Sequence, residues 1–297
     1  MPFIIRTSAV FGVILAAVLA AFTLVLVPPE AMPESVRFQV EEGESLHSIS
    51  QRLEDEGIVR SALLFRGWIS FLKRDTAISL GIYEFDKSGT IGSVVNKFIQ
   101  GPDQPLISIT IPEGSTTRQI ASLVKKILPS ISTDIFVEKV QEKELDGFLF
   151  PSTYYPLPSY TEDDMIRVMN MTFEKQYEDN FSKERLPKVL SSRKEVIILA
   201  SILEGEANTK DDMKTVAGIL EKRLEKGMRL QVDVAEITYR KSGLPEQPIN
   251  NPGLMAIEAV FHPTETPYLY YLTGNDGRMY YAKTYEEHKR NIQKYLR

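Results

Sequence analysis

The sequence contains no cysteine and only three histidines, which excludes two common kinds of site. Without cysteine the chain can form neither a disulfide framework nor a thiolate metal site. His47, His262 and His288 lie too far apart along the chain for ordinary zinc-ligand spacing. The sequence also lacks a phosphate-cradling glycine loop and a nucleophile elbow. It therefore predicts a protein that uses neither a metal nor a cofactor.

Positive charge is not in excess either. The 35 lysines and arginines are outnumbered by 40 aspartates and glutamates, which gives a net charge of -5. Such a chain offers no basic surface to attract phosphate backbones, so nucleic acid is excluded as an expected partner. With 43% hydrophobic and 25% charged residues, the composition is that of a globular protein, and 297 residues are enough for two modest domains.

The N-terminus carries an uncharged run of twenty residues, SAVFGVILAAVLAAFTLVLV, at positions 8–27. This is about the length that crosses a hydrocarbon core of roughly 30 Å. Arg6 precedes the run and Glu30 follows it, so the positive-inside rule keeps the short N-terminus in the cytoplasm. A cleaved signal peptide is the alternative, but the run ends in Leu-Val-Pro-Pro rather than at a small-x-small site. The prediction is a cytoplasmic N-terminus at 1–7, a single transmembrane helix at 8–27 and a linker at 28–35.

Two similar stretches follow the linker, VRFQVEEGESLHSISQRL from Val36 and ISITIPEGSTTRQIASLV from Ile107. Each predicts a strand, a Glu-Gly turn and a helix. Between them lie a helical segment, a strand-like GIYEF and a helix from Thr90. Residues 36–128 thereby resemble a LysM-like βα module, the small fold with which many cell-wall proteins hold glycan. The alternative is a structural neck built from generic βα pieces. The remainder, 129–297, is expected to form a mixed α+β catalytic domain, so the fold class of the whole chain is α+β.

Glu204 follows an apolar run, residues 196–203, that is hydrophobic on nearly all sides. A helix of this kind belongs inside a domain. Glu204 continues the line of Ile197 and Ala200, so its carboxylate is expected on a packed face near the C-terminal end of the helix. Poor solvation and the partial negative charge at a helix C-terminus both raise a carboxyl pKa towards the range of a general acid. From spacing alone, however, a glutamate that merely marks the end of a core helix is the favoured interpretation. Glu206 is expected to face another direction.

Several ordered motifs change that balance. They are DGFLFPSTYYPLP at 146–158, SILEGEA at 201–207, and further on GMRLQVD, GLPEQPINNPG and HPTETPYLYYLTGNDGRMYYAKTYEEH. Taken in this order, they resemble the YceG-like (MltG) family of endolytic murein transglycosylases, and the resemblance extends from the N-terminal anchor to the C-terminus. It implies a catalytic Glu204 and a single-pass protein of the bacterial cytoplasmic membrane with its catalytic domain on the outer face. The implied partners are peptidoglycan glycan strands, nascent ones above all, and peptidoglycan synthases, with a role in limiting strand length.

The chain departs from this family at three places. Ser152 stands where the family commonly has Asp, Lys222 stands where it commonly has Asn, and the segment 232–243 is much shorter. These departures motivate a rival hypothesis, a wall-binding scaffold with a degenerate active site. A third hypothesis is a hydrolase that uses Asp233 and water.

The chemistry of a lytic transglycosylase needs one carboxyl group. Protonated Glu204 would give its proton to the oxygen between MurNAc and GlcNAc, and its carboxylate would then take the proton of the MurNAc 6-hydroxyl as that oxygen closes on C1. The product is a 1,6-anhydro end, so the enzyme is a carbon-oxygen lyase acting on polysaccharide. The residues expected to bind the substrate are Gln231, Asp233, Tyr239, Asn250, Asn251, Tyr268 and Tyr281. The alternative is that they have a structural role, in a solvated turn or in the packing of strands.

Overall fold

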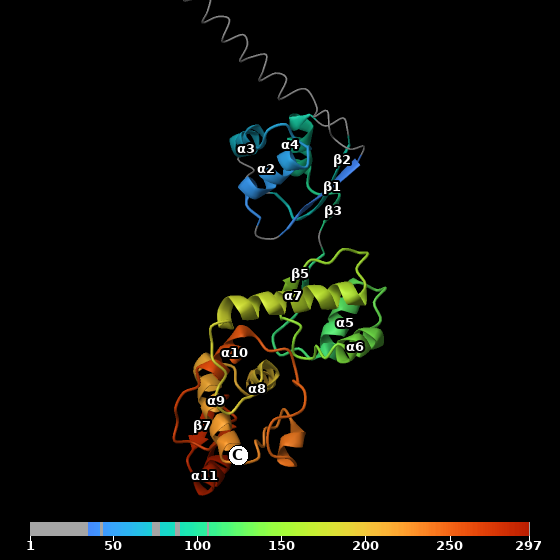
Figure 1. The fold of residues 1–297 in the computed structure, drawn as a ribbon. Helices are drawn as coiled ribbons and strands as arrows, with labels where there is room; N and C mark the ends of the chain where they lie inside the picture. The colour runs from blue at the N-terminus through green and yellow to red at the C-terminus, as the bar shows by residue number, and fades with distance from the viewer. Residues whose placement is uncertain (1–34, 42–43, 73–77, 87–89, 106, 297) are drawn as a thin grey trace, which may run out of the picture. The chain divides into compact units, whose positions relative to one another are not determined.

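The computed structural model describes residues 35–41, 44–72, 78–86, 90–105 and 107–296 (Figure 1). The chain divides into two compact units between Ile107 and Ser108. The predicted transmembrane helix at 8–27 and most of the linker lie outside the described residues. Among the helices that the structure describes, none has the length and apolar character needed to cross a membrane.

Among its described residues, the first unit has a three-stranded antiparallel sheet and three helices. Its elements are β1 (Ser35–Val40), α2 (Leu46–Asp55), α3 (Ala62–Phe71), β2 (Gly81–Asp86), α4 (Ile91–Gln100) and β3 (Gln104–Pro105). The strand predicted at GIYEF and the helix predicted from Thr90 are thus confirmed, and the Thr90 side chain caps that helix. The centre of the core is aromatic, with the Tyr83 and Phe98 rings stacked at 4.3 Å between centroids.

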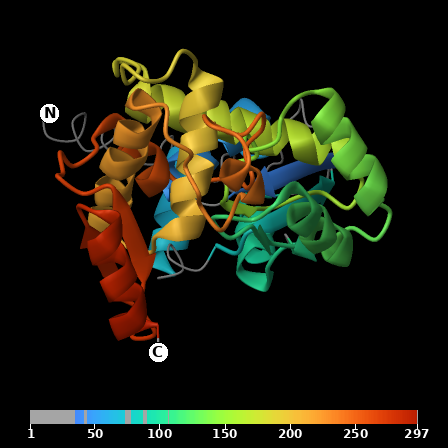
Figure 2. The same ribbon diagram turned by 90° about the horizontal axis from the view of Figure 1, so that it is seen from below.

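The second unit contains more helix than strand. Its elements are β4 (Ile109–Thr110), α5 (Thr117–Ile127), α6 (Thr133–Glu142), β5 (Thr153–Tyr154), α7 (Glu162–Phe181), α8 (Arg193–Glu206), α9 (Lys210–Glu225), a short 3-10 helix (Glu236–Tyr239), α10 (Leu254–Phe261), β6 (Tyr270–Thr273), β7 (Met279–Ala282) and α11 (Tyr285–Tyr295). Within this unit α8 lies between the α5–α6 pair and the end that carries the β6–β7 hairpin and α11 (Figures 1 and 2). The mixed α+β class and the C-terminal hairpin agree with the prediction.

The division between the units lies twenty-one residues earlier than the expected boundary after residue 128, since 128 minus 107 is 21. The second βα stretch is the reason. Ile109 of β4 and Ile120 of α5 are buried in one cluster with Phe136 of α6 and Met165 of α7. The apolar face of α5 is therefore covered by the helices that follow it, and the stretch belongs to the second unit.

The apolar run that precedes Glu204 is the interior of α8. All eight residues from Val196 to Leu203 are buried, as the prediction of a helix inside the domain requires. Six of them, all except Ile198 and Ser201, pack with α9 and α10 in one core cluster that includes Val216 and Ile257. This burial fixes the axis of α8, and with it the place where Glu204 leaves the core.

Candidate active site

Glu204 lies in the last turn of α8 and is partly buried. Its Oε2 accepts a hydrogen bond from the backbone N–H of Gly253, with 3.0 Å between the two atoms. Within the described residues, its Oε1 has no hydrogen-bond partner. Burial raises the pKa of the Glu204 carboxyl, the Gly253 N–H lowers it, and the negative charge of Glu113 raises it again. The net direction is upwards, which favours the protonated form that a general acid needs.

Glu113 is a functional candidate that sequence reasoning missed. It lies in the turn between β4 and α5, next to Gly114, whose φ of 72° is in the left-handed region that favours glycine. A Cβ atom at position 114 would lie 3.4 Å from Glu204 Cγ, so this turn lies against the Glu204 side chain. A side chain at position 253 would overlap the Glu113 carboxyl. Both carboxyl groups therefore converge on Gly253.

The sequence signal for Glu113 was present but ambiguous. The pair Glu-Gly in IPEGS was interpreted as a turn between a strand and a helix, which it is. The same pair occurs in the first βα stretch, at 42–43. The pair at 113–114 lies beside Glu204 because of the position of α8, which is a distant part of the chain.

Asn251 holds this turn in place. Its side-chain carbonyl accepts from the backbone N–H of Leu149 at 2.8 Å, and its side-chain amide donates to the carbonyl of Ser115 at 2.9 Å. The backbones of Ser115 and Asn251 also form an isolated bridge, and Gly114 N–H donates to the Asn251 carbonyl. Asn251 is 1% exposed. It was predicted to meet sugar hydroxyls, but its side chain is engaged with protein backbone on both sides.

Asn250 is also buried rather than presented on the surface of its loop. Its side-chain amide donates to the carbonyl of Ser201 in α8, and the hydroxyl of the same serine accepts from Ile249 N–H. The Asn250 Oδ1 atom is buried and has no hydrogen-bond partner. The loop 249–251 thus connects α8 to the turn that carries Glu113, and a contact of Asn250 with sugar stays a prediction.

Glu206 faces a different group of residues, as expected. Its carboxylate accepts from the Tyr271 hydroxyl at 3.0 Å and from the Val234 N–H at 3.4 Å. Burial raises the pKa of Glu206, and the charge of Asp233 adds to this rise. Glu206 therefore joins the end of α8 to strand β6 and to the loop at 233–234.

The predicted residues Asp233 and Tyr239 form a pair, because the Tyr239 hydroxyl donates to the Asp233 carboxylate. This bond raises the pKa of Tyr239 to about 12. Both side chains and that of Gln231 are exposed, and Gln231 has a positive φ of 50°. The charge of Asp233 acts on Glu206, whereas that of Glu113 acts on Glu204. Glu113 is thus the better placed second carboxylate.

The predicted tyrosines of the hairpin region contact one another. The Tyr268 and Tyr281 rings stack at 5.5 Å between centroids, and the Tyr281 hydroxyl donates to Asp212. Tyr270 stacks on His288. Lys222, one of the departures from the family pattern, donates to the backbone carbonyl of Thr266 and so supports the segment before the hairpin. Sugar contacts of Tyr268 and Tyr281 stay predictions.

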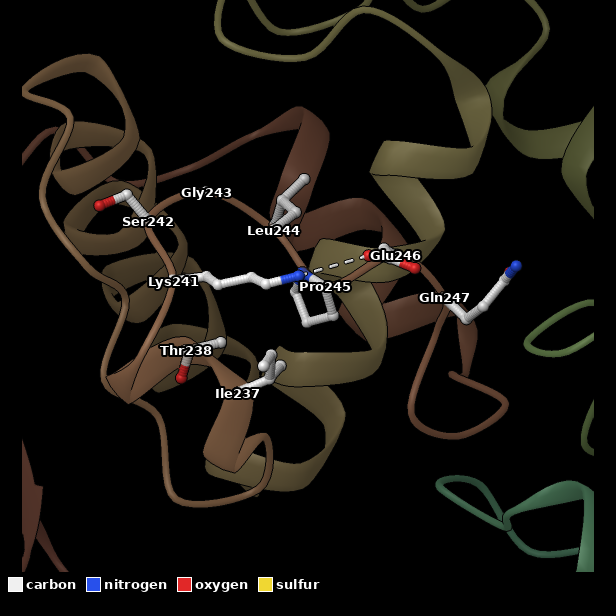
Figure 3. Close-up of a pocket in the computed structure, with 9 residues that line it drawn as sticks. All are labelled: Ile237, Thr238, Lys241, Ser242, Gly243, Leu244, Pro245, Glu246 and Gln247. Carbon is white, nitrogen blue, oxygen red and sulfur yellow. Dashed lines mark ion pairs between the residues drawn. The ribbon is translucent and has the colours of Figure 1, made fainter.

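A cavity of about 410 Å³ lies at the end of the segment 232–243 and continues to residue 247 (Figure 3). Ile237, Thr238 and the loop 241–247 line it, and an ion pair of 3.6 Å joins Lys241 to Glu246 across it. Neither Glu204 nor Glu113 is among its lining residues. In the described part of the chain, no cluster of three or more histidine, aspartate and glutamate side chains is arranged to hold a metal ion. The groups that the structure places beside Glu204 are the carboxyl group of Glu113 and the backbone N–H of Gly253.

The chain is similar to a family of known proteins over most of its length. The model of the YceG-like family matches residues 38–237 and 237–294 of the chain. A crystal structure of a yceG-like protein from Listeria monocytogenes is 25% identical in sequence and superposes with a TM-score of 0.54, covering 86% of this chain and 98% of that one.

Curated relatives from two species carry the name endolytic murein transglycosylase. The protein of Bacillus subtilis (strain 168) is 25% identical over 309 residues, which cover 88% of this chain and 85% of that protein. The protein of Streptococcus pneumoniae serotype 2 is 25% identical over 320 residues, which cover 86% of this chain and 58% of that protein. The chain thus spans most of the Bacillus relative and somewhat more than half of the Streptococcus relative.

Proposed function

The chain belongs to the YceG-like family, and we propose that it is a lytic transglycosylase that cuts peptidoglycan glycan strands internally at the bond between MurNAc and GlcNAc. One observation carries the proposal. Glu204 presents a partly buried carboxyl group of raised pKa at the end of a buried helix, with one oxygen held by Gly253 and the other unbonded. Cleavage of a glycosidic bond requires a carboxylic acid as proton donor, and a raised pKa favours that protonated form.

The first step is proton donation. Protonated Glu204 gives its proton to the bridging oxygen, the bond from that oxygen to C1 of MurNAc breaks, and GlcNAc leaves as an alcohol. Positive charge develops on C1 and the ring oxygen, as in other glycosidic cleavages. The Glu113 carboxylate lies near enough to affect the Glu204 pKa, and in this step its negative charge stabilises the developing positive charge.

The second step closes a ring. The Glu204 carboxylate, now unprotonated, takes the proton of the MurNAc 6-hydroxyl while that oxygen forms a bond to C1. The product is a 1,6-anhydroMurNAc end, and Glu204 is again protonated for the next cycle. The hydroxyl belongs to the reacting sugar, so it has the proximity advantage of an intramolecular reaction over a free water molecule.

We also propose a role for the parts that precede the second unit. The first unit, with its order β1, α2, α3, β2, holds glycan in the manner of a LysM-like module. The uncharged run at 8–27 anchors the chain in the cytoplasmic membrane with the two units on the outer face. From that position the enzyme acts on nascent strands beside the synthases and limits their length.

A hydrolase is the second candidate function, and Glu113 is the observation that favours it. Two carboxyl groups near one bond are the equipment of glycoside hydrolases, in which the second serves as a nucleophile or as the base that activates water. In that case the reducing end would carry an oxygen from water. The sequence alone predicted Asp233 as the second carboxylate of a hydrolase, but Glu113 is the carboxylate whose charge acts on Glu204.

The test compares Glu204→Gln with Glu206→Gln on uncrosslinked glycan strands. Glutamine at 204 keeps the shape and the bond to Gly253 but carries no transferable proton, so cleavage should fall by at least about 10²-fold. Glutamine at 206 can still accept from Tyr271, so its effect should be much milder. The melting temperatures of both variants serve as a folding control. Full activity of Glu204→Gln would contradict the proposal, and absence of cleavage by the wild type on any glycan would support the scaffold hypothesis.

A further inference from the structure

A groove of about 480 Å³ begins at the turn between β4 and α5 and follows one side of α5. Glu113 and Gly114 line its start, and Arg118, Ser122 and Lys126 line its continuation along the helix. Glu204 does not line the groove itself, but Gly114 does and lies against the Glu204 side chain, so the groove begins at the turn that contacts the proposed general acid. We propose that this groove binds the acidic stem peptide of the MurNAc residue whose glycosidic bond is cut. This inference rests on the proposed function.

The chemistry of the substrate requires a place for that peptide. The stem peptide is attached through a lactyl group to C3 of MurNAc, and the bond that breaks is at C1 of the same ring. A sugar positioned with its C1 oxygen at Glu204 must therefore direct its peptide along the protein surface close to this carboxyl. The peptide carries free carboxylates, so a recognition groove needs positive charge at some distance from the two catalytic acids.

Two cations of the groove satisfy this requirement. Arg118 and Lys126 are eight residues apart on α5, which corresponds to about 12 Å along the helix axis. An extended peptide covers about 3.3 Å per residue, so this distance matches roughly four residues. The separation of the two cations is therefore that of a short peptide lying parallel to α5, with its carboxylates facing Arg118 and Lys126.

Both cations are available for such a ligand. Lys126 is exposed and forms no ion pair with any other described residue. Arg118 pairs with Asp134 at 3.1 Å, but the two side chains are 66% and 86% exposed. An ion pair in that environment contributes little to stability, so Arg118 can exchange Asp134 for a ligand carboxylate at small cost. The apolar Leu123 in the same groove offers a surface for the peptide methyl groups.

A simpler role for Lys126 is to complement the negative end of the α5 dipole. The adjacent Lys125 is equally well placed in the last turn for that task, but it does not line the groove. Lys125→Glu is therefore the matched control for Lys126→Glu, because the two substitutions make the same charge change on the same turn. Both side chains are exposed, so neither substitution should affect folding.

The experiment measures cleavage of two substrates by the full chain: uncrosslinked glycan with its stem peptides, and the same glycan after an amidase has removed them. Lys126→Glu should raise KM about five-fold on the peptide-bearing glycan with little change in kcat, as expected for one lost charge contact. On the peptide-free glycan it should match the wild type. Lys125→Glu should match the wild type on both. A free acidic stem peptide should inhibit the wild type more strongly than Lys126→Glu, which also decides the case if peptide-free glycan is not cut.

The outcomes separate the two proposals. If the wild type cuts neither glycan, the proposed function fails. If it cuts glycan but Lys126→Glu changes both substrates equally, or changes neither, or behaves like Lys125→Glu, the peptide groove is wrong while the proposed function stands. Equal inhibition of wild type and Lys126→Glu by the free peptide would likewise overturn the groove.

Discussion

The two βα stretches of this chain have nearly the same sequence pattern but pack against different elements. In the first unit, β1 pairs with β2, and α2 contributes Ile49 and Leu53 to a core made entirely of residues from that unit. In the second unit, β4 pairs with β5, α5 packs among α6 and α7, and the turn between β4 and α5 meets Glu204. The local pattern therefore specifies a strand followed by a helix in both stretches, while the elements that pack around the second stretch bring its turn against Glu204.

The largest effect that separates the two regions is expected from a bulky residue at a glycine. Gly114 and Gly57 both have a φ of 72°, but position 114 faces Glu204 Cγ and position 57 has no atom within 4 Å. Valine is strained at such a φ by about 1–2 kcal/mol at either position. Only Gly114→Val also displaces Glu204, so we expect it to lower kcat/KM at least ten-fold, while Gly57→Val lowers stability alone. Similar activities of the two variants would show that the turn does not position Glu204.

The second effect concerns stability. Asn251→Ala leaves the N–H of Leu149 and the carbonyl of Ser115 without their side-chain partner. The buried Leu149 N–H then has no partner, at a cost of about 1–3 kcal/mol, whereas the Ser115 carbonyl still accepts from the Asn251 backbone N–H, so we expect a loss of about 2–3 kcal/mol. In a unit of this size this lowers Tm by about 5–10 °C, measured by differential scanning calorimetry. Asn250→Ala removes one bond, to Ser201, and should cost about half as much or less. A larger effect at Asn250 would contradict the role given to Asn251.

The sequence predicts much of the fold and of the candidate site, but not all of either. The burial of 196–203, the raised pKa of Glu204 and the hairpin at 270–282 follow from hydrophobic pattern, helix-end chemistry and turn residues. The contribution of Glu113 does not, because it depends on the electrostatic effect of one carboxyl group on another that lies far away along the chain. The boundary after residue 107 does not follow from the sequence either, because it depends on which helices cover α5. The helices α2 and α5 are both amphipathic, so their sequences do not show which unit each one joins.

The third prediction is a shift in pH dependence. The Glu113 charge disfavours ionisation of Glu204 and so raises its pKa. Glu113→Gln removes this charge, which lowers the Glu204 pKa, so the protonated general acid is lost at a lower pH. The alkaline limb of kcat/KM should therefore move to lower pH, with a few-fold loss of activity above neutrality. Glu42→Gln, at the same place in the first stretch, is the control and should leave the profile unchanged. An alkaline limb that stays in place, or moves upwards, would remove Glu113 from the site.

The smallest effect is expected for glycan binding by the separated units. Residues 35–107 contain their own core, so this fragment should fold by itself. It should sediment with purified peptidoglycan a few-fold more than residues 108–297 carrying Glu204→Gln, which prevents cleavage during the assay. Equal sedimentation of the two fragments would favour the alternative that the first unit is a structural neck.

The central claim, that Glu204 drives an intramolecular ring closure, is tested most directly by the products of the wild-type chain in water enriched in oxygen-18. Mass spectrometry of fragments from uncrosslinked glycan should show 1,6-anhydroMurNAc ends, one water lighter than reducing ends, and no oxygen-18. Reducing ends that carry oxygen-18 would contradict the claim, establish hydrolysis, and point to Glu113 as the carboxylate that activates water or attacks C1.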